Sequence, residues 1–322
     1  MPDARTVPDP PAGPALEIAC DESGYEGERL IGTTTDVFAH ASLRIGHDDA
    51  TACILELRRR IRSPATEYKA GNILRAKHRA TLRWLLGRDG PLPGAAHVFL
   101  IDKRWYVLTK LADLLLEGAP DAATLHRLGP AAYGDLWETF LEAANDLLRV
   151  KDQPDVPEEL MRVTGLLLER ASGPGPLRDL LTAVAQTRPK AELFRAWLLG
   201  DPVTNSVVDP LLPAIERVLD RWGTADRPVV IAHHRQTTLS EQRLAQLSGR
   251  AEFGGLRHAD SFTDMRVQLA DLVAGAARKL AADELNGRAE PELTDLLRPY
   301  ADPASIWGDQ RSAERLGIRG TA

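Results

Sequence analysis

Apolar and polar residues alternate in two stretches near the start of the chain, a pattern that indicates half-buried strands. In the first stretch Leu16, Ile18 and Cys20 share one face, and the second stretch covers residues 35–45. The four residues after Cys20 are of the types found in turns, so the first strand is expected to end there. Short apolar runs predict three more strands, at residues 97–101, 228–232 and 252–259.

Apolar residues recur at intervals of three and four over most of the remaining chain, which predicts helices. Asp48 or Asp49 is expected to cap a helix that runs to residue 62 and ends before Pro64. The other predicted helices cover residues 73–86, 107–116, 131–150, 157–171, 177–186, 191–199, 211–222, 240–247, 265–280 and 291–297. This order of elements predicts an α/β layer fold that carries a large helical insertion.

These elements divide the chain into four parts. Residues 1–14 contain five prolines and are expected to form a disordered leader. Residues 15–106 and 225–285 make up the predicted α/β core, residues 107–224 the helical insertion and residues 286–322 a C-terminal extension. The sequence has no internal repeat of the length that builds solenoids or propellers.

Composition narrows the class of protein without identifying it. Hydrophobic residues make up 43% and charged residues 27% of the 322 residues, as in ordinary globular proteins. Cys20 and Cys53 are too few for a disulfide framework, so we expect a reducing, cytoplasmic location. No apolar run approaches the roughly 20 residues that a membrane helix needs, and we expect neither a secretory signal nor a membrane partner.

The chain as a whole has a net charge of −6, but one segment of it is strongly basic. Residues 58–88 contain ten Lys and Arg but one acid, Glu67, which gives a local net charge of +9. Such asymmetry indicates either an anionic partner, whose phosphates Lys and Arg would contact, or an internal seam with acidic parts of the chain. Arg75, Lys77 and Arg79 are the candidates for substrate contact within this segment.

Two groups of carboxylates are candidates for chemistry. Asp21 and Glu22 follow the first strand, where ligand sites of α/β sheets are found, and carboxylate oxygens can hold a hard cation. The alternative for this pair is a plain turn. Asp264, Gln268 and Asp271 share one face of an otherwise almost wholly apolar helix. A buried Asp271 would need a metal ion or a basic partner, unless this polar face simply lies in water.

Motifs of several other enzyme classes are missing from the sequence. There is no GxxxxGK[ST] phosphate loop, no GxGxxG dinucleotide motif, no GxSxG nucleophile elbow and no CxxC zinc motif. His233 and His234 follow a predicted strand, where they are either ligands or ordinary hydrogen-bonding residues.

Three features taken together resemble the domain-of-unknown-function 3800 family. They are DESG at residues 21–24, an E-x-K element at residues 67–69, and DSFTDMRVQLADLVAG at residues 260–275. The resemblance implies a ribonuclease-H-like α/β fold, with a mixed sheet flanked by helices and a carboxylate cluster at its centre. The positions that match the family's motifs are Asp21, Glu67, Lys69, Asp260, Gln268 and Asp271.

One departure from the family pattern follows the strand at residues 228–232. Where the family carries an acid near a histidine, roughly as H-D-E, this chain reads His233-His234-Arg235-Gln236. His234 therefore stands in place of the acid. A histidine still ligates metals, but with less charge compensation than a carboxylate, so loss of activity is one of the expectations.

The leading hypothesis from this resemblance is a metal-dependent nuclease that hydrolyses phosphodiester bonds of DNA or RNA. Mg²⁺ or Mn²⁺, as one ion or as a two-ion site, would activate water and stabilise the leaving oxygen. The expected metal ligands are Asp21, Glu67, Asp260, Asp271 and His234. The expected catalytic residues are Asp21, Glu22, Lys69 and Asp271, and the expected substrate contacts are Lys69, Arg75, Lys77, Arg79 and Gln268.

Two other functions stay open at this point. The first is a catalytically degenerate ribonuclease-H-like protein that binds nucleic acid, or that binds a protein partner or a second copy through the helical insertion. The second is an enzyme of the same core that acts on a small phosphoester or nucleotide and does not need the basic segment.

Overall fold

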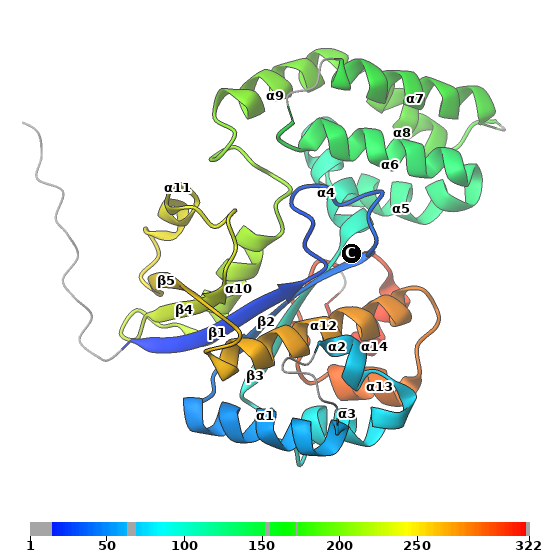
Figure 1. Cartoon of the computed structure of the whole chain (residues 1–322). Coiled ribbons are helices and arrows are strands. Elements are labelled where there is room, and N and C mark those ends of the chain that lie inside the picture. Colours follow the sequence, from blue (N-terminus) through cyan, green and yellow to red (C-terminus); the bar gives the residue numbers. More distant parts are fainter. Residues whose placement is uncertain (1–14, 63–68, 152–154, 172, 320–322) are drawn as a thin grey trace, which may run out of the picture.

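The computed structural model describes residues 15–62, 69–151, 155–171 and 173–319. Five strands form one sheet in the order β3-β2-β1-β4-β5, between two layers of helices (Figure 1). β1 pairs antiparallel with β2 and parallel with β4, which confirms an α/β fold around a mixed sheet. The strands are β1 Leu16–Ser23, β2 Val37–Leu43, β3 Ala96–Asp102, β4 Val229–His234 and β5 Phe253–Ala259.

β1 extends three residues beyond its predicted end at Cys20. Residues 21–23 stay paired with residues 39–41 of β2, and the turn begins only at Gly24, where φ is +81°. The prediction of a turn directly after Cys20 is therefore wrong. The antiparallel ladder satisfies the backbone groups of these residues, and this outweighs the local turn preference of their side chains.

Helices make up most of the remaining described chain. Their bounds are α1 His47–Ile61, α2 Ala70–Ile73, α3 Arg79–Leu86, α4 Lys103–Leu115, α5 Ala119–Tyr133, α6 Asp135–Leu148, α7 Val156–Arg170, α8 Pro176–Ala185, α9 Arg188–Gly200, α10 Leu211–Trp222, α11 Glu241–Leu244, α12 Met265–Leu285, α13 Pro291–Leu297 and α14 Gln310–Leu316. Two short 3₁₀ turns cover Ala76–His78 and Ala245–Leu247.

Some helices differ from those predicted. The basic helix expected over residues 73–86 is broken, because Arg75 has an extended backbone between α2 and the turn that leads into α3. The helix expected over residues 131–150 is split at Gly134, whose φ of +54° ends α5 and begins α6. Gly46 rather than Asp48 or Asp49 precedes α1, and α14 has no counterpart in the prediction. Pro64 lies outside the described residues.

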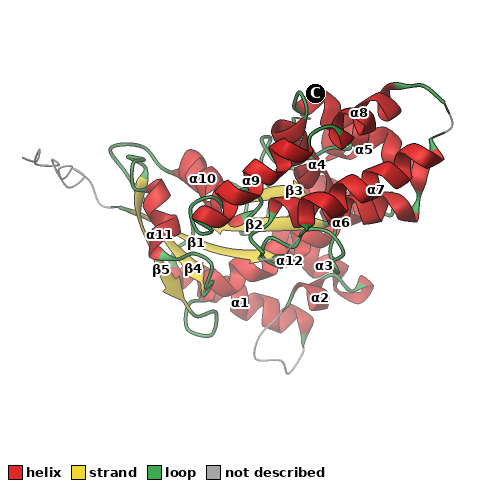
Figure 2. Ribbon diagram, turned by 90° about the horizontal axis from the view of Figure 1, so that it is seen from above, coloured by secondary structure: helices red, strands yellow, loops and turns green. Residues whose placement is uncertain are grey.

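Each face of the sheet carries its own apolar core. On one face α1, α3, α12, α13 and α14 pack against residues such as Leu43 and Leu100. On the other face α4 and α10 pack against residues such as Ile18 and Phe38, and α5 to α9 extend this core away from the strands. Figure 2 shows α5 to α8 together on the side of the molecule away from β4 and β5.

Two regions outside the predicted core contact the sheet directly. In α10, the indole Nε1 of Trp222 donates to Oγ of Ser42 in β2 at 2.9 Å. After α13 the chain runs along the free edge of β3, where the amide of Val98 donates to the carbonyl oxygen of Tyr300 at 2.8 Å. This segment covers an edge strand that would otherwise present unpaired backbone groups.

Two findings concern the cysteines and the helices of the described part of the chain. Cys20 and Cys53 are free thiols, and both are buried. Among the helices of the described residues, none is both long enough and apolar enough to cross a membrane.

Candidate functional site

The carboxyl ends of β1 and β4 lie side by side in the sheet. Their pairing ends at Cys20 and His233, whereas β1 continues for three more residues against β2 alone. The pairing with β4 therefore does not extend to Asp21 and Glu22. In α/β sheets, ligands bind beyond the carboxyl ends of the strands, so Asp21 and Glu22 lie where the sequence predicts a site.

Asp21 is 2% exposed, and its two oxygens are in different situations. Oδ1 accepts the amide hydrogen of Glu22 at 2.8 Å, whereas no hydrogen bond reaches the buried Oδ2. Nδ1 of His234 lies 3.5 Å from Oδ2, which is longer than an ordinary N–H···O bond. Burial raises the pKa of Asp21 above its ordinary value, and the negative charge of Asp271 raises it further, although His234 opposes both effects.

Glu22 is the second acid at this strand end. Its Oε1 accepts from Nε2 of Gln236 at 2.7 Å, and its Oε2 is buried without a hydrogen bond. Burial raises the pKa of Glu22, and so does the charge of Asp21, while His233 acts in the opposite direction. Two neighbouring carboxyl groups are thus buried at one strand end, which disfavours the ionised form of both. His234 lies 3.5 Å from Asp21 and His233 lies 3.7 Å from Glu22, and a bound cation would stabilise the ionised forms further.

Two buried histidines lie beside Glu22. Nδ1 of His233 donates to the carbonyl oxygen of His234 at 2.8 Å, so its Nε2 is the acceptor when the ring is neutral. Nε2 of His40 lies 3.1 Å from this acceptor and must therefore carry the hydrogen. Burial lowers the pKa of both imidazoles, which favours these neutral tautomers.

His234, in contrast, is partly open to solvent. Its side chain is 41% exposed, and the adjacent Asp21 carboxylate raises the pKa of His234 above its ordinary value. The protonated imidazole then places a positive charge beside the carboxylate of Asp21, which burial has separated from water. His234 thus lies beside the acid of β1, and it compensates that acid with positive charge.

Asp271 comes to this site from α12, which packs across β1 and β2. Its Oδ2 accepts from Nζ of Lys69 at 2.8 Å. Lys69 immediately precedes α2, and α2 approaches α12 so closely that a Cβ built on Gly275 would lie 2.5 Å from Cβ of Ala70. The glycine one turn after Asp271 therefore permits the approach that positions Lys69.

Other predicted site residues have different surroundings. Asp260 is exposed in the loop before α12, where its Oδ1 accepts the amide hydrogen of Phe262 at 2.8 Å. Gln268 is 1% exposed and donates to the carbonyl oxygen of Ser261 at 3.3 Å, while its Oε1 is buried without a partner. Glu67 lies outside the described residues.

The basic segment is partly neutralised by acids of this chain. Arg79 forms a two-fold ion pair with Glu290, with Nη2 to Oε1 at 2.6 Å, and Arg83 pairs with Glu292. Arg59 and Arg60 both pair with Glu56 of their own helix. Arg75 and Lys77 are exposed and remain available for an anionic partner.

His40 and Gln236 are neighbours of Glu22 that are not among the site residues predicted from the sequence. His40 is the residue of β2 directly opposite Glu22, and this relation depends on the strand register. A register between strands cannot be read from one strand's pattern alone, so no signal in the sequence points to His40.

The described residues contain no group of three or more His, Cys, Asp and Glu side chains placed to hold a metal ion. In comparisons with protein-family models, with curated proteins and with solved structures, no match to this chain was found. The resemblance to the domain-of-unknown-function 3800 family therefore stays a prediction, and the function must be argued from the site itself.

Proposed function

We propose that this protein hydrolyses phosphodiester bonds of nucleic acid with a divalent cation held at Asp21 and Glu22. The observation that carries the proposal is the pair of buried oxygens, Asp21 Oδ2 and Glu22 Oε2, that receive no hydrogen bond. Histidines lie near both oxygens but beyond ordinary hydrogen-bond length, His234 at 3.5 Å from Asp21 and His233 at 3.7 Å from Glu22, and two such buried carboxylates at one strand end favour a bound cation.

The two carboxylates fit one common mode of Mg²⁺ or Mn²⁺ binding. Mg²⁺ keeps several waters and is commonly bound by one or two carboxylates together with substrate phosphates, rather than by a full cage of protein ligands. Asp21 and Glu22 supply these two carboxylates, and a substrate phosphate would complete the shell. This mode of binding would explain why the described residues contain no preformed group of three protein ligands. A second ion would need further ligands, and Glu67, which the sequence offers, lies outside the described residues.

The protein's own residues have separate roles in this proposal. The cation would polarise the phosphate and lower the pKa of bound water. His234 is close to Asp21 and half open to solvent, so it can exchange a proton with water at the site. Lys69 is 59% exposed beside Asp271 and can turn toward a phosphate oxygen. Arg75 and Lys77 would contact the nucleic-acid backbone farther from the reacting group.

A ribonuclease-H-like identity for the fold is part of the same proposal. It is supported by the mixed sheet, by Asp21 on the central strand β1, and by Asp271 on the helix that packs across that strand. These are two of the positions at which the family resemblance expects acids.

One observation favours a second candidate, a nucleic-acid-binding protein of this fold that has lost catalysis. Lys69 pairs with Asp271, and His234 lies against Asp21, so two basic side chains compensate two of the carboxylates without a metal. Such a protein would keep the basic segment and bind nucleic acid in the presence of a chelator.

A nuclease assay separates the two candidates. Labelled single- and double-stranded DNA and RNA are incubated with Mg²⁺, Mn²⁺ or EDTA, using wild-type protein, Asp21→Asn and Asp271→Asn. Asp48→Asn, at an exposed acid of α1, is the matched control. We expect metal-dependent cleavage that falls at least 100-fold in both site variants and not in the control. Binding without cleavage under every condition would contradict the nuclease and support the second candidate.

A further inference from the structure

Arg278 lies on the face of α12 that also carries Asp271. It follows Asp271 by seven residues, which is two helical turns and about 10 Å along the helix axis. In β1, Ser23 lies on the same face as Asp21, about 7 Å farther along the strand. Nε of Arg278 donates to Oγ of Ser23 at 3.0 Å. The guanidinium is therefore held beside the strand end that carries the candidate cation site.

A glycine leaves the space that this side chain occupies. Gly24 has a φ of +81°, and a Cβ built on it would lie 2.8 Å from Cδ of Arg278 and closer still to the carbonyl oxygen of Val37. A larger residue at position 24 would therefore collide with the arginine and with β2. The last two residues of the DESG motif thus act together in this structure, because Ser23 anchors Arg278 and Gly24 leaves room for it.

The positive charge of Arg278 has no acidic partner within ion-pair distance among the described residues. The acids whose charge acts on it are Asp283 and Glu26, and both have other cations beside them. Asp283 pairs with Lys279, and Glu26 lies 3.5 Å from Nζ of the buried Lys103. Burial lowers the pKa of Arg278 from its ordinary value, and these two acids only partly oppose that effect. A partly buried and uncompensated guanidinium favours the binding of an anion.

The donors of Arg278 are suited to phosphate oxygens. In the described part of the chain only its Nε has a hydrogen-bond partner, so both Nη groups are available to an acceptor. A guanidinium fork matches phosphate oxygens. In the proposed hydrolysis the reacting phosphate lies at Asp21 and Glu22, and Arg278 is anchored two residues farther along β1. The phosphate that it reaches is therefore a different one from the phosphate that reacts.

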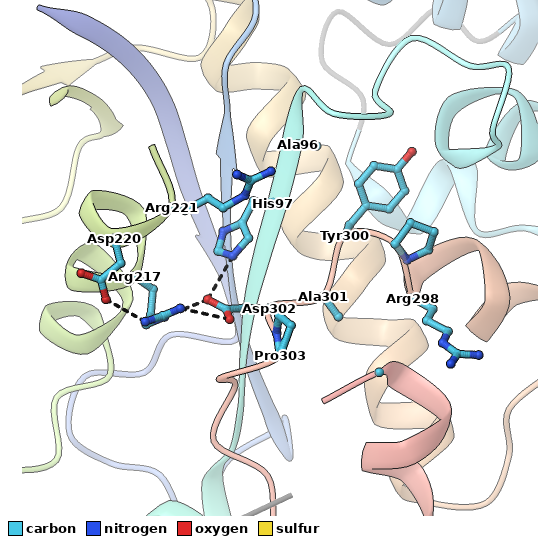
Figure 3. A pocket seen from close by; sticks show the side chains of 12 residues that line it. Ala96, His97, Arg217, Asp220, Arg221, Arg298, Tyr300, Ala301, Asp302 and Pro303 are labelled. Atoms are coloured by element: carbon cyan, nitrogen blue, oxygen red, sulfur yellow. Dashed lines mark hydrogen bonds and ion pairs between the residues drawn. The ribbon is translucent and has the colours of Figure 1, made fainter. Parts of the chain in front are cut away.

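Arginines beside a hollow at β3 lack such an arrangement. The hollow, of about 740 Å³, lies between α10, the start of β3 and the segment after α13 (Figure 3). Figure 3 shows Arg221 and Arg298 on opposite sides of β3 and of that segment, so their guanidinium groups do not converge. Arg217 already donates to Asp302 there, from Nε at 2.8 Å. Arg298 is exposed and far from β1 in the sheet order, which makes it a suitable control for Arg278.

We propose that Arg278 binds the phosphate next to the scissile one, and that this contact selects a nucleic-acid strand over a small phosphodiester. The inference rests on the hydrolytic function proposed above and names the substrate class of that site. A small phosphodiester has one phosphate and cannot occupy both positions. Arg278 is then a substrate-contact residue away from the reacting bond, and Ser23 is the positioning residue that holds it.

Fluorescence anisotropy with a labelled 20-nucleotide single strand tests the contact at several salt concentrations. The strand is bound in Ca²⁺, which takes oxygen ligands as Mg²⁺ does, and in EDTA. We expect Arg278→Gln to bind about tenfold more weakly than wild type, the loss of one charge-assisted contact. The slope of log K against log salt concentration should become shallower by about 0.7, the value for one phosphate of a single strand.

Three further variants separate the charge from its placement. Arg278→Lys keeps the charge, so it should keep the wild-type salt slope while it binds about threefold more weakly, because the fork is lost. Ser23→Ala removes only the anchor and should behave in the same way. Arg298→Gln removes an arginine elsewhere and should bind as wild type does. Thermal unfolding of each variant confirms that it is folded.

Cleavage in Mn²⁺ tests the selection of a strand. The substrates are the same strand and bis(4-nitrophenyl) phosphate, which has one phosphate. Arg278→Gln should raise KM for the strand about tenfold with little change in kcat, and it should hydrolyse the small ester as wild type does.

Three results would overturn the inference. They are an absence of strand binding by wild type, an unchanged affinity and salt slope in Arg278→Gln, and an equal loss of activity of this variant on both substrates. The last result would place Arg278 at the reacting phosphate. If wild type cleaves neither substrate while Arg278→Gln still loses affinity and salt slope, the strand contact is supported and the hydrolytic function fails separately.

Discussion

Nζ of Lys69 lies 2.8 Å from Oδ2 of Asp271, a residue 202 positions farther along the chain. The apolar surroundings of Asp271 on α12 predict that this acid needs either a metal ion or a basic partner, and the fold supplies the basic partner. The ion pair joins the start of α2 to the helix that packs across β1. It compensates the charge of Asp271, which lies near enough to Asp21 to raise the pKa of that acid.

Replacing Lys69 with methionine should change metal binding and catalysis in opposite directions. Without the ammonium group, the carboxylate of Asp271 adds its full negative charge to the site of Asp21 and Glu22. We expect Mn²⁺ to bind about fivefold more tightly, which corresponds to about 1 kcal/mol, because one nearby positive charge is gone. We expect nuclease activity to fall about tenfold, since the phosphate loses a cationic contact.

Calorimetry with Mn²⁺ and single-turnover cleavage measure the two effects. Lys77→Met removes the same charge at an exposed position of the basic segment and should leave Mn²⁺ affinity unchanged. Equal Mn²⁺ affinity in Lys69→Met and wild type would show that Asp271 does not act on the cation site.

Gly275→Ala should destabilise the protein through one steric contact. The added Cβ would lie 2.5 Å from Cβ of Ala70, closer than two methyl carbons can approach, so α2 must move away from α12. We expect the free energy of unfolding to fall by about 1–3 kcal/mol, as in other overpacked sites. Urea denaturation measures this change.

A matched glycine gives the control for this substitution. Gly165 lies inside α7, and a Cβ built there meets no atom within 4 Å. Gly165→Ala should therefore stabilise the protein, by about 0.5–1 kcal/mol, through the higher helix propensity of alanine. If both substitutions shift the unfolding midpoint in the same direction, the close approach of α2 and α12 is not the cause.

The part of the site that the sequence predicts is the part encoded locally. The alternating pattern of β1 places Asp21 at a strand end, and the spacing of α12 places Asp271 on a helix. The choice between a metal ion and a basic partner for Asp271 depends on Lys69, which reaches it only through the packing of α2 on α12. No periodicity within either segment contains that information.

The same limit applies to the fold. The sequence predicts the alternation of strands and helices well, because each element carries its own apolar period. It misses the end of β1, because pairing with β2 keeps three turn-forming residues in the strand. It does not predict that the segment after α13 covers the edge of β3, because extended chain that pairs through single backbone contacts has no side-chain period of its own.

His234→Asp tests the departure from the family pattern. In the metal-free protein the new carboxylate would face Asp21 and lose the compensation that His234 provides, so the melting temperature should fall by several degrees. Addition of Mn²⁺ should raise the melting temperature of His234→Asp more than that of wild type, because a bound ion stabilises the folded state by mass action. Thermal unfolding with and without Mn²⁺ measures both effects.

His78→Asp is the control for this experiment, because it introduces the same acid in the 3₁₀ turn at Ala76–His78, next to Lys77 and outside the strand end. It should show no gain in the Mn²⁺ response. If His234→Asp responds to Mn²⁺ no more than this control, the strand end does not hold a cation and the second candidate function gains support.

Asp264 at the start of α12 should contribute stability that depends on pH. Its carboxylate accepts from the amide, Nε and Nη2 of Arg266 at 3.1, 3.0 and 2.7 Å, and from Nη2 of Arg257 at 3.3 Å. His47 lies 4.0 Å away, and Glu17 shares both arginines. Burial by itself would raise the pKa of Asp264, but the hydrogen bonds and charge of Arg266 outweigh it and lower the pKa to about 2.

The direction of the pH effect follows from this lowered pKa. In the unfolded chain the Asp264 carboxyl titrates near 3.8, so the stabilisation is present above that pH and is lost as pH falls through 2. The shift corresponds to about 2 kcal/mol. We therefore expect Asp264→Asn to lower the free energy of unfolding by about 2 kcal/mol at pH 7, and the difference from wild type to shrink to less than half of that at pH 2.5. Urea denaturation from pH 7 to pH 2.5 measures the difference.

Asp260→Asn, at an exposed acid of the same loop, should stay within about 0.5 kcal/mol of wild type throughout. A difference between Asp264→Asn and wild type that is constant with pH would assign the effect to packing and not to the ionised carboxylate.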